Sequence, residues 1–265
     1  MTNIVGSLTL AAPNMTPNYE VKLLLDPTAV LGTDGGLTGD ILSTFNMPST
    51  VTKQNVQFLD KNLELFTEDW IVRIRNTENE DGFELTYKKR YTITDGNIDA
   101  ALTKANEDHF NAGDAKYEAQ VECGYLKQTL SISRKKKATG SKNGGMDLPG
   151  TSKSQAMAIN EAPDKFDNWR SRKWGTSVLE KSRIYGPVFA KRWIGSWSGM
   201  RLYIEVWPIL NSAGTGMENI VEASFKTDSH AVASTKHGSL ITFLRDKGWL
   251  LAQDSLKTQL IMERY

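Results

Sequence analysis

WIVRIR at residues 70–75 and FELTYK at residues 83–88 alternate apolar with polar side chains. A period of two places the two kinds of side chain on opposite faces of a β-strand. The polar, turn-rich connection at residues 76–82 joins the two segments, so together they predict a β-hairpin. Most polar positions in this hairpin carry a charge, and one of its faces is therefore predicted to be strongly ionic.

The same alternation recurs along the chain and gives about eight predicted strands. Besides the first hairpin, the predicted strands are residues 18–23, 117–123, 130–134, 189–197, 201–207 and 220–226, with Ser198-Gly199 as the turn of a second hairpin. Strands of this kind and number fit a closed antiparallel barrel better than an α/β sheet. The predicted fold class is all-β to α+β, an eight-stranded antiparallel β-barrel (tunnel) with flanking helices.

Helices and one long loop are predicted between the strands. Helices are expected at residues 99–110, 163–174 and 239–247, with Gly248 as the C-cap of the last, and residues 239–265 are expected to be a helical C-terminal segment. Residues 135–154 are basic and rich in Gly, Ser and Lys, so they predict a mobile loop whose Lys135-Lys136-Lys137 run is solvated. Residues 1–265 are predicted to form a single domain.

The charge balance of the chain argues against some classes of partner. The 265 residues include 32 Lys and Arg against 31 Asp and Glu, a formal net charge of +1. Nucleic-acid coats and electrostatic membrane binders usually carry a basic excess, so neither class is expected. With one cysteine and three histidines, neither a disulfide nor a Cys/His metal cluster is expected, and a metal would bind oxygen ligands. With no membrane-length apolar run and no convincing signal peptide, a cytoplasmic location is expected.

Charged side chains of both signs occupy the polar face of nearly every predicted strand. They are Glu20 and Lys22, Arg73 and Arg75, Glu84 and Lys88, Glu118 and Glu122, Arg201 and Glu205, and Glu222 and Lys226. If the sheet closes with its apolar face outward against helices, these charges line the interior, where they are costly unless they bind something. Basic groups there would hold phosphates, and acidic groups would hold Mg²⁺. The alternative is an open sheet whose charged face is simply wet.

Segments between residues 18 and 226 are similar, in order, to the strand motifs of one family. The similar segments are Asn18-Tyr19-Glu20-Val21-Lys22 to E-x-E-x-K, residues 57–60 and 70–75 to Y-x-D-T and L-R-I-R, residues 85–88 to L-T-x-K, residues 118–122 to R-x-E-x-E, residues 191–193 to K-x-R-Y, residues 204–206 to an acidic strand, and residues 222–225 to E-x-E-F. In these motifs the chain resembles the CYTH superfamily, the triphosphate tunnel metalloenzymes. No single motif is specific, but their shared order is.

The resemblance implies an eight-stranded antiparallel tunnel and a function in phosphate chemistry. Family members include triphosphatases, thiamine triphosphatase and class IV adenylyl cyclases, so the predicted function is divalent-metal-dependent hydrolysis of a phosphoanhydride or organic polyphosphate. By position, the resemblance implies phosphate binding by Lys22, Arg73, Arg75, Lys88 and Arg192, catalytic roles for Glu20, Glu118 and Glu205, and Mg²⁺ or Mn²⁺ binding by Glu20, Glu122 and Glu222.

At three motif positions the chain lacks the acidic residue that the family has. Asn18, Gln120 and Ser224 stand where the motifs have acidic residues. The basic residues survive, so phosphate binding is better preserved than the means for efficient triphosphate hydrolysis. The sequence therefore leaves a non-catalytic polyphosphate-binding module open as a third hypothesis, besides hydrolysis and the alternative that follows.

Aromatic residues of the late hairpin suggest a lyase or cyclase. Trp193 and Trp197 share one strand face, whereas Tyr203 and Trp207 share the face of Glu205. Core packing is the ordinary explanation, but aromatic side chains in the tunnel would suit a prenyl diphosphate that ionises to a carbocation, which aromatic faces stabilise. In each case the expected partner is a small-molecule phosphate or diphosphate, without nucleic acid or membrane. The sequence does not decide between a monomer and a homodimer.

Overall fold

Nine strands close into a barrel in the computed structural model of the chain, which describes residues 12–139, 145–254 and 257–265. The strands are β1 (Asn18–Leu25), β2 (Thr52–Asp60), β3 (Trp70–Thr77), β4 (Phe83–Ile93), β5 (Glu118–Cys123), β6 (Gln128–Ala138), β7 (Arg183–Trp197), β8 (Met200–Leu210) and β9 (Met217–Thr227). Their order around the barrel is β1-β5-β6-β4-β3-β2-β7-β8-β9, and β9 pairs with β1 to close the ring. A short tenth strand, β10 (Leu250–Leu251), pairs with the end of β1 beyond β5.

The closed barrel is confirmed, but the predicted strand number and purely antiparallel order are not. The additional strand is β2, where Gln54, Asn55 and Gln57 are buried among apolar residues and leave no period of two. Strands that are odd in number cannot alternate in direction around a closed ring, so at least one neighbouring pair must be parallel. That pair is β1 and β5, in which Glu20 lies opposite Glu122.

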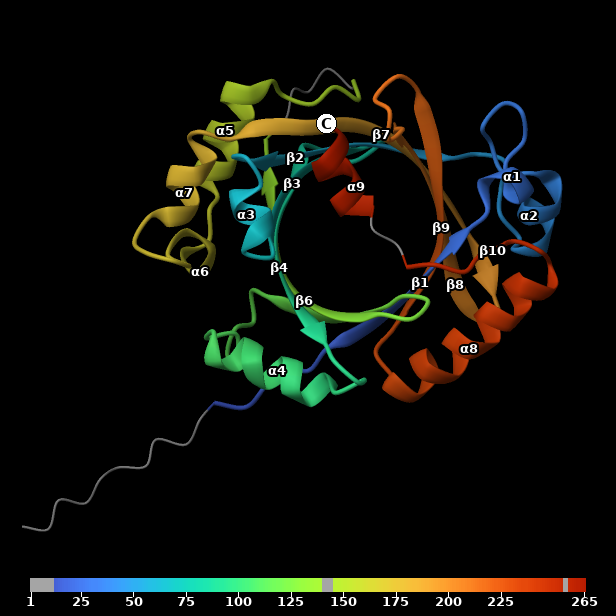
Figure 1. The fold of residues 1–265 in the computed structure, drawn as a ribbon, viewed down its shortest axis with the longest axis horizontal. Coiled ribbons are helices and arrows are strands. Elements are labelled where there is room, and N and C mark those ends of the chain that lie inside the picture. Colours follow the sequence, from blue (N-terminus) through green and yellow to red (C-terminus); the bar gives the residue numbers. More distant parts are fainter. Residues whose placement is uncertain (1–11, 140–144, 255–256) are drawn as a thin grey trace, which may run out of the picture.

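Most helices cover the outside of the barrel (Figure 1). The helices are α1 (Pro27–Val30), α2 (Gly39–Thr44), α3 (Glu64–Thr67), α4 (Ile98–Glu107), α5 (Thr151–Asn160), α6 (Asp164–Asp167), α7 (Trp174–Leu179), α8 (His230–Asp246) and α9 (Lys257–Arg264). α4 packs against β4 and β6, and α8 packs against β1 and β9. In the described part of the chain, no helix combines the length and the apolar character that crossing a membrane requires.

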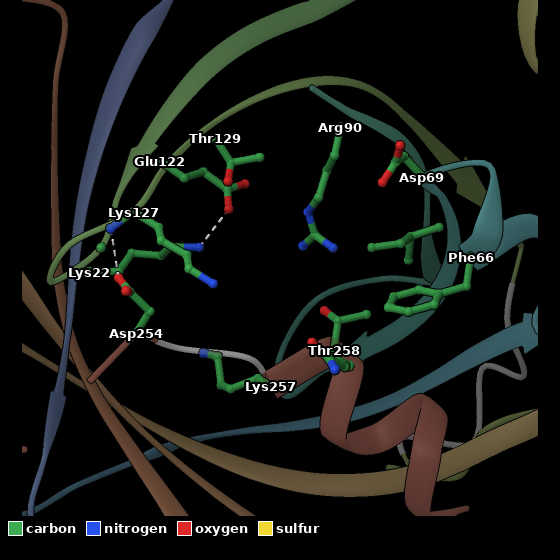
Figure 2. A pocket seen from close by; sticks show the side chains of 13 residues that line it. Lys22, Phe66, Asp69, Arg90, Glu122, Lys127, Thr129, Asp254, Lys257 and Thr258 are labelled. Atoms are coloured by element: carbon green, nitrogen blue, oxygen red, sulfur yellow. Dashed lines mark hydrogen bonds and ion pairs between the residues drawn. The ribbon is translucent and has the colours of Figure 1, made fainter. Parts of the chain in front are cut away.

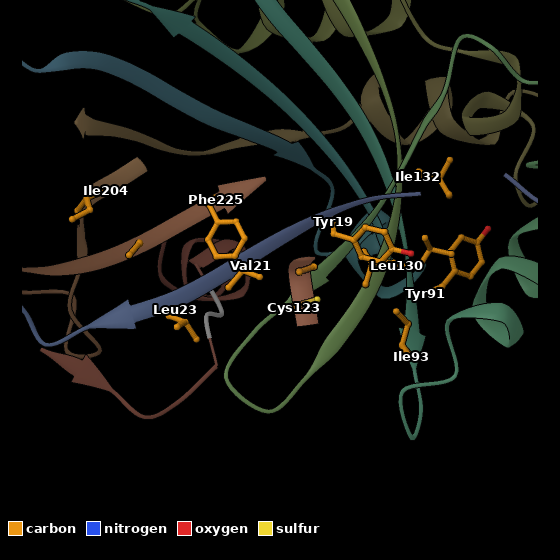
Figure 3. Packing of buried hydrophobic residues seen from close by; sticks show 14 of the residues in the cluster. Tyr19, Val21, Leu23, Tyr91, Ile93, Cys123, Leu130, Ile132, Ile204 and Phe225 are labelled. Atoms are coloured by element: carbon orange, nitrogen blue, oxygen red, sulfur yellow. The ribbon is translucent and has the colours of Figure 1, made fainter. Parts of the chain in front are cut away.

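The larger hydrophobic core lies between the outer face of the barrel and these helices (Figure 3). On β1, Tyr19, Val21 and Leu23 point outward into this core, whereas the alternate residues Glu20 and Lys22 line the interior. The prediction that the apolar strand faces pack outward and the charged faces point inward is therefore confirmed. The strands alternate regularly because their outer faces pack in the hydrophobic core and their inner faces line the charged lumen.

One helix, α9, lies inside the ring of strands (Figure 1). Its Ile261 and Met262 are buried in a second, smaller apolar cluster together with Val56 of β2 and Ile209 of β8. The far end of α9 is tied to β8, because the guanidinium of Arg264 donates to the Leu210 carbonyl, 2.8 Å away, and the Tyr265 hydroxyl accepts from the Leu210 amide. The helix therefore fills an apolar side of the lumen and leaves a charged side open.

Two predictions between residues 135 and 174 are wrong in part. The basic run at 135–137 belongs to β6, where it pairs with β4, so it is not a loop; residues 140–144 of the predicted loop lie outside the described residues, and α5 already begins at Thr151. The predicted helix at 163–174 consists of α6 and the start of α7. It is interrupted because the side chain of Asp167 accepts from the amide of Thr176 and so caps a new helix.

The other two predicted helices are confirmed with shifted ends. The helix expected at 99–110 is α4, and the one expected at 239–247 is the second half of α8. α8 begins earlier because the hydroxyl of Ser229 accepts from the amide of Val232. It ends as predicted, since Gly248 adopts a left-handed φ of 70°. The predicted helical segment at 239–265 also contains β10.

Gly195 of β7 lies where the chain after α2 packs on the barrel. A Cβ there would clash with the carbonyl oxygen of Phe45 and lie 2.5 Å from Met47 Cγ. We expect Gly195→Ala to lower the free energy of unfolding by about 1–3 kcal/mol, because the backbone must shift. Gly39→Ala is the matched control, because a Cβ there meets nothing within 4 Å. Urea unfolding measures both, and equal midpoints for the two variants would contradict the prediction.

Candidate functional site

A cavity of about 330 Å³ occupies the charged side of the lumen. Every residue predicted for the site from the sequence lines it: Glu20, Lys22, Arg73, Arg75, Lys88, Glu118, Glu122, Arg192, Glu205 and Glu222. The three positions where the family motifs have acids, Asn18, Gln120 and Ser224, line the same cavity. Seven strands contribute these residues, so closure of the barrel is what brings them together.

Glu122 of β5 is the centre of one ionic cluster. Its carboxylate lies 2.6 Å from Lys22 Nζ and 2.8 Å from Lys88 Nζ, and it accepts a hydrogen bond from the hydroxyl of Ser131. Burial alone would raise the pKa of Glu122, but the two lysines and Arg90 outweigh burial and hold that pKa well below its usual range. The carboxylate therefore stays ionised and fixes both ammonium groups in the lumen.

Glu84 of β4 holds two guanidinium groups of β3 in the same way. Its Oε1 lies 3.0 Å from Arg73 Nη2 and 2.8 Å from Arg75 Nη2. Burial, followed by the repulsion of Arg75, lowers the pKa of Arg73 to about 10. The Nε atoms of both arginines are buried without a hydrogen-bond partner among the described residues. Buried donors of this kind are what a bound anion would satisfy.

Glu205 and Glu222 form a third cluster with Lys257 of α9. The two glutamates lie directly opposite each other on β8 and β9, and Lys257 Nζ lies 3.1 Å from the first carboxylate and 2.8 Å from the second. Glu205 also accepts from Arg192 Nε at 2.8 Å and from Trp207 Nε1 at 2.9 Å. Burial would raise the pKa of Glu205, but Lys257 and Arg192 lower it far more, so this carboxylate is ionised and fully engaged.

Glu20 and Glu118 lie toward a more exposed end of the lumen. Among the described residues Glu20 has a single ion pair, 3.6 Å from Nζ of the half-exposed Lys226. Glu118 is 62% exposed and pairs with Lys135 at 2.7 Å. These two carboxylates are therefore held less firmly than the glutamates deeper in the barrel.

The acidic residues of the lumen do not fit the predicted Mg²⁺ or Mn²⁺. Nowhere in residues 12–139, 145–254 and 257–265 do three or more His, Cys, Asp or Glu side chains converge as metal ligands. Of the predicted ligands Glu20, Glu122 and Glu222, the second binds two lysines and the third binds Lys257. Nine basic and six acidic side chains line the cavity, so its charge already favours an anion over a further cation.

An apolar wall adjoins the charged one. Phe58, Ile71, Trp207 and Ile261 line the cavity, and all four belong to the small apolar cluster around α9. Trp207 and Tyr203 therefore face the lumen with Glu205. The other two tryptophans of the late hairpin, Trp193 and Trp197, pack in the outer core instead. The cavity thus combines a basic wall that suits phosphate groups with an apolar wall that suits an organic group.

A second cavity of about 230 Å³ adjoins the first turn of α9 (Figure 2). Asp254 forms part of its wall and accepts from the amides of Leu126 and Lys127. The residues that line both cavities are Lys22, Ile71, Arg90, Glu122, Lys257 and Thr258. The first turn of α9 therefore contributes to the walls of both cavities through Lys257 and Thr258.

Five charged lining residues are absent from the predicted site residues: Glu84, Arg90, Lys135, Lys226 and Lys257. Glu84 and Lys226 were predicted only as members of the charged strand faces. Glu84 and Arg90 continue the alternation of β4 on either side of Lys88, so that pattern was a usable signal. Lys135 was missed because its strand was predicted to end at residue 134. Lys257 carries no signal in the sequence, since only the packing of α9 inside the barrel brings it to the site.

Comparisons with solved structures give the fold. A candidate adenylyl cyclase from Hippeastrum, described as having a dominant triphosphatase activity, aligns with a TM-score of 0.50 at 16% identity over 93% of this chain and 96% of its own. A candidate adenylate cyclase from Bacillus halodurans aligns with a TM-score of 0.49 at 13% identity over 94% of this chain and 98% of its own. No protein-family model and no curated relative matches the chain. The predicted CYTH-type tunnel is confirmed as the fold.

We expect Glu122→Gln to destabilise the protein near neutral pH and to make it less sensitive to acid. The pKa of this carboxyl is lower in the folded chain than in the unfolded one, so its ionised form stabilises the fold above about pH 4 and the contribution is lost as the pH falls through the folded-state value. In Glu122→Gln the two lysines Lys22 and Lys88 lose their carboxylate partner. The free energy of unfolding should therefore fall by about 3–5 kcal/mol at about pH 7. Urea unfolding across the acid range measures this difference, which should shrink toward about pH 3.

Glu118→Gln is the matched control on the same strand. Its carboxylate is 62% exposed, so we expect the free energy of unfolding to change by less than about 1 kcal/mol. An equal loss of stability in the two variants would contradict the role of ionised Glu122 as the centre of its ionic cluster. A Glu122→Gln variant as acid-sensitive as the wild type would contradict it as well.

Proposed function

We propose that this chain, which has the CYTH-type tunnel fold, binds the phosphate chain of an organic di- or triphosphate in its lumen and cleaves a phosphoanhydride bond. The observation that carries the proposal is the surplus of basic side chains, nine against six acidic ones, around one cavity inside the barrel. A phosphate chain carries several negative charges and many acceptor oxygens, so it complements this surplus. The expected partner is a small molecule, not a nucleic acid or a membrane.

The arginines are suited to grip phosphate oxygens. Arg73, Arg75 and Arg192 each present a planar fork of donors, and each is held in the lumen by one glutamate. Because their ion pairs already fix them, little side-chain freedom would be lost when a ligand binds. The unpartnered Nε atoms of Arg73 and Arg75 provide two further donors.

A protein of the same fold supports cleavage rather than binding alone. The Hippeastrum protein is described as having a dominant triphosphatase activity. A shared fold is an analogy and leaves the reaction to be argued from the site. In the site, positioned cations would stabilise the charge that develops on the phosphoryl group and on the leaving oxygen, which is the main requirement of phosphoryl transfer.

Glu20 is the best placed carboxylate to orient the attacking water. It lines the cavity, its ion pair with Lys226 is 3.6 Å long, and its side chain is 17% exposed. By contrast, Glu205 is engaged by Arg192, Lys257 and Trp207, so we assign it to positioning these cations. Glu118 lies at the exposed end and would act only on a group near the opening. The metal cofactor is not part of this proposal, because the donor set does not fit it.

The apolar wall favours a substrate with an organic body. It also supports a second candidate function, that of a lyase or cyclase. Phe58 and Trp207 would pack against that body while the phosphates occupy the charged side. The same arrangement suits a lyase or cyclase that ionises a prenyl diphosphate, since aromatic faces stabilise a carbocation. The two reactions differ in product. Orthophosphate release from triphosphates indicates hydrolysis, whereas pyrophosphate with a rearranged hydrocarbon or alcohol from prenyl diphosphates indicates the lyase.

Arg73→Ala should impair turnover without unfolding the barrel. We expect kcat/KM for orthophosphate release from the best triphosphate of such a panel to fall about 100-fold, because one cation of the phosphate site is lost. Glu84 keeps Arg75 as its partner, so the fold should persist. Arg245→Ala, an exposed arginine of α8, is the control and should retain full activity. Wild-type activity in the Arg73 variant would contradict the proposal.

Trp207→Ala should affect the organic body more than the phosphates. We expect the affinity for an organic triphosphate to fall about tenfold more than the affinity for inorganic tripolyphosphate, because only the former uses the apolar wall. Trp197→Ala is the control, since that ring packs outside the barrel against Phe225 and Phe243. Calorimetric titration of both ligands gives the ratio, and an unchanged ratio in Trp207→Ala would count against an organic substrate.

A further inference from the structure

Glu205 and Glu222 pose an electrostatic problem inside the barrel. They are direct cross-strand partners on β8 and β9, and they are 8% and 4% exposed. Like charges directly opposite in a sheet destabilise it, and the low dielectric of a buried site strengthens their repulsion. Either a shared proton or a nearby cation relieves such a repulsion, and in many phosphoryl-transfer sites the cation is Mg²⁺.

In this chain the cation beside both carboxylates is the ammonium group of Lys257. Its Nζ lies 3.1 Å from Glu205 Oε2 and 2.8 Å from Glu222 Oε1. It also lies 4.7 Å from the centre of the Trp207 ring, so an aromatic face adds to its enclosure. The position between the two carboxylates, where a shared divalent ion would be expected, is thus taken by the protein itself.

The lysine is held there by the rest of α9. Ile261, one turn further along, is fully buried in the apolar cluster of the lumen. At the end of the helix, Arg264 pairs with Glu218 at 2.7 Å. Lys257 is therefore anchored by packing that does not depend on its own charge, and it does not have to be recruited when a ligand enters.

The remaining lining leaves little for a divalent ion to bind. Asn18, Gln120 and Ser224 place neutral side chains where carboxylates would be needed, and all three line the cavity. One buried carboxylate oxygen, Glu222 Oε2, has no hydrogen-bond partner in the described part of the chain, but its carboxylate already binds Lys257. A divalent ion would further increase an existing surplus of positive charge.

We propose that the ammonium group of Lys257 takes the place of the divalent cation, so that this chain binds the phosphate chain of its substrate without a metal. The inference rests on the proposed function, because it concerns the same cavity. An ammonium group has three donors, of which Glu205 and Glu222 take two. The third can bind a phosphate oxygen while the two carboxylates remain neutralised.

Titration of the full chain with inorganic tripolyphosphate, with EDTA or with Mg²⁺, tests the inference. For the wild type we expect the same affinity within about twofold under both conditions, because the phosphate oxygens are bound by side chains. For Lys257→Ala in EDTA we expect binding about 10- to 100-fold weaker, the effect of losing one charge-assisted contact. Mg²⁺ should restore part of the loss in this variant, because it can enter between the freed carboxylates.

A second readout needs no polyphosphate. Electron paramagnetic resonance should detect Mn²⁺ bound to Lys257→Ala but not to the wild type. Lys257→Ala removes the lysine shared by the two carboxylates, so Glu222 loses its partner while Glu205 keeps Arg192. The double variant Lys257→Ala/Glu222→Gln removes the repulsion between the two carboxylates. It should therefore fold at least as well as Lys257→Ala by circular dichroism, and it should lose the Mn²⁺ site. Lys247→Ala, an exposed lysine at the end of α8, should behave as the wild type in every assay.

The outcomes separate this inference from the proposed function. Wild-type binding that requires Mg²⁺, or a tight Mn²⁺ site in the wild type that Lys257→Ala does not change, would overturn the inference alone. Either result would mean that Glu222 and the phosphates of the ligand bind a divalent ion. Failure of the wild type to bind tripolyphosphate or any organic polyphosphate under either condition would overturn the proposed function and this inference together.

Discussion

Neutralisation of charge inside a closed barrel is the constraint on which the rest of this structure depends. Each deep glutamate of the lumen is matched by basic groups from other elements, as Glu122 is by Lys22 and Lys88 and Glu222 is by Lys257 of α9. A buried ion pair contributes little net stability, but removing one partner leaves an expensive unpaired charge. The clusters therefore depend on every contributing strand being in register, and a shift of one residue would turn these charges into the outer core.

That constraint also explains why the hydrophobic core lies outside the barrel and why one helix lies inside it. With charges occupying the inner face, apolar residues such as Val21 and Phe225 must be covered by helices on the outer face. On one side of the lumen the inner face is apolar too, and α9 packs against it through Ile261 and Met262. The same helix then supplies Lys257 to the charged side. Packing and electrostatics are thus linked through one short helix.

The sequence predicted the charged strands well because inward and outward faces follow a period of two. It missed β2, where Gln54 and Gln57 are buried beside apolar residues, so the period that marks a strand is lost. It also missed the parallel pair of β1 and β5, because pairing partners follow from closure of the ring and not from either strand alone. All predicted site residues line one cavity, yet Lys257 could not be found, since its position depends entirely on tertiary packing.

The two sides of the lumen together limit which ligands make physical sense. Inorganic phosphate chains would use the basic residues but leave Phe58 and Trp207 facing water. A purely apolar ligand would leave the surplus of positive charge in the cavity uncompensated. A molecule with a phosphate chain and an apolar or aromatic body satisfies both walls at once. Because the acids that would hold a metal are replaced or already paired, recognition of the phosphates then falls to arginine and lysine side chains fixed in advance by the carboxylates beside them.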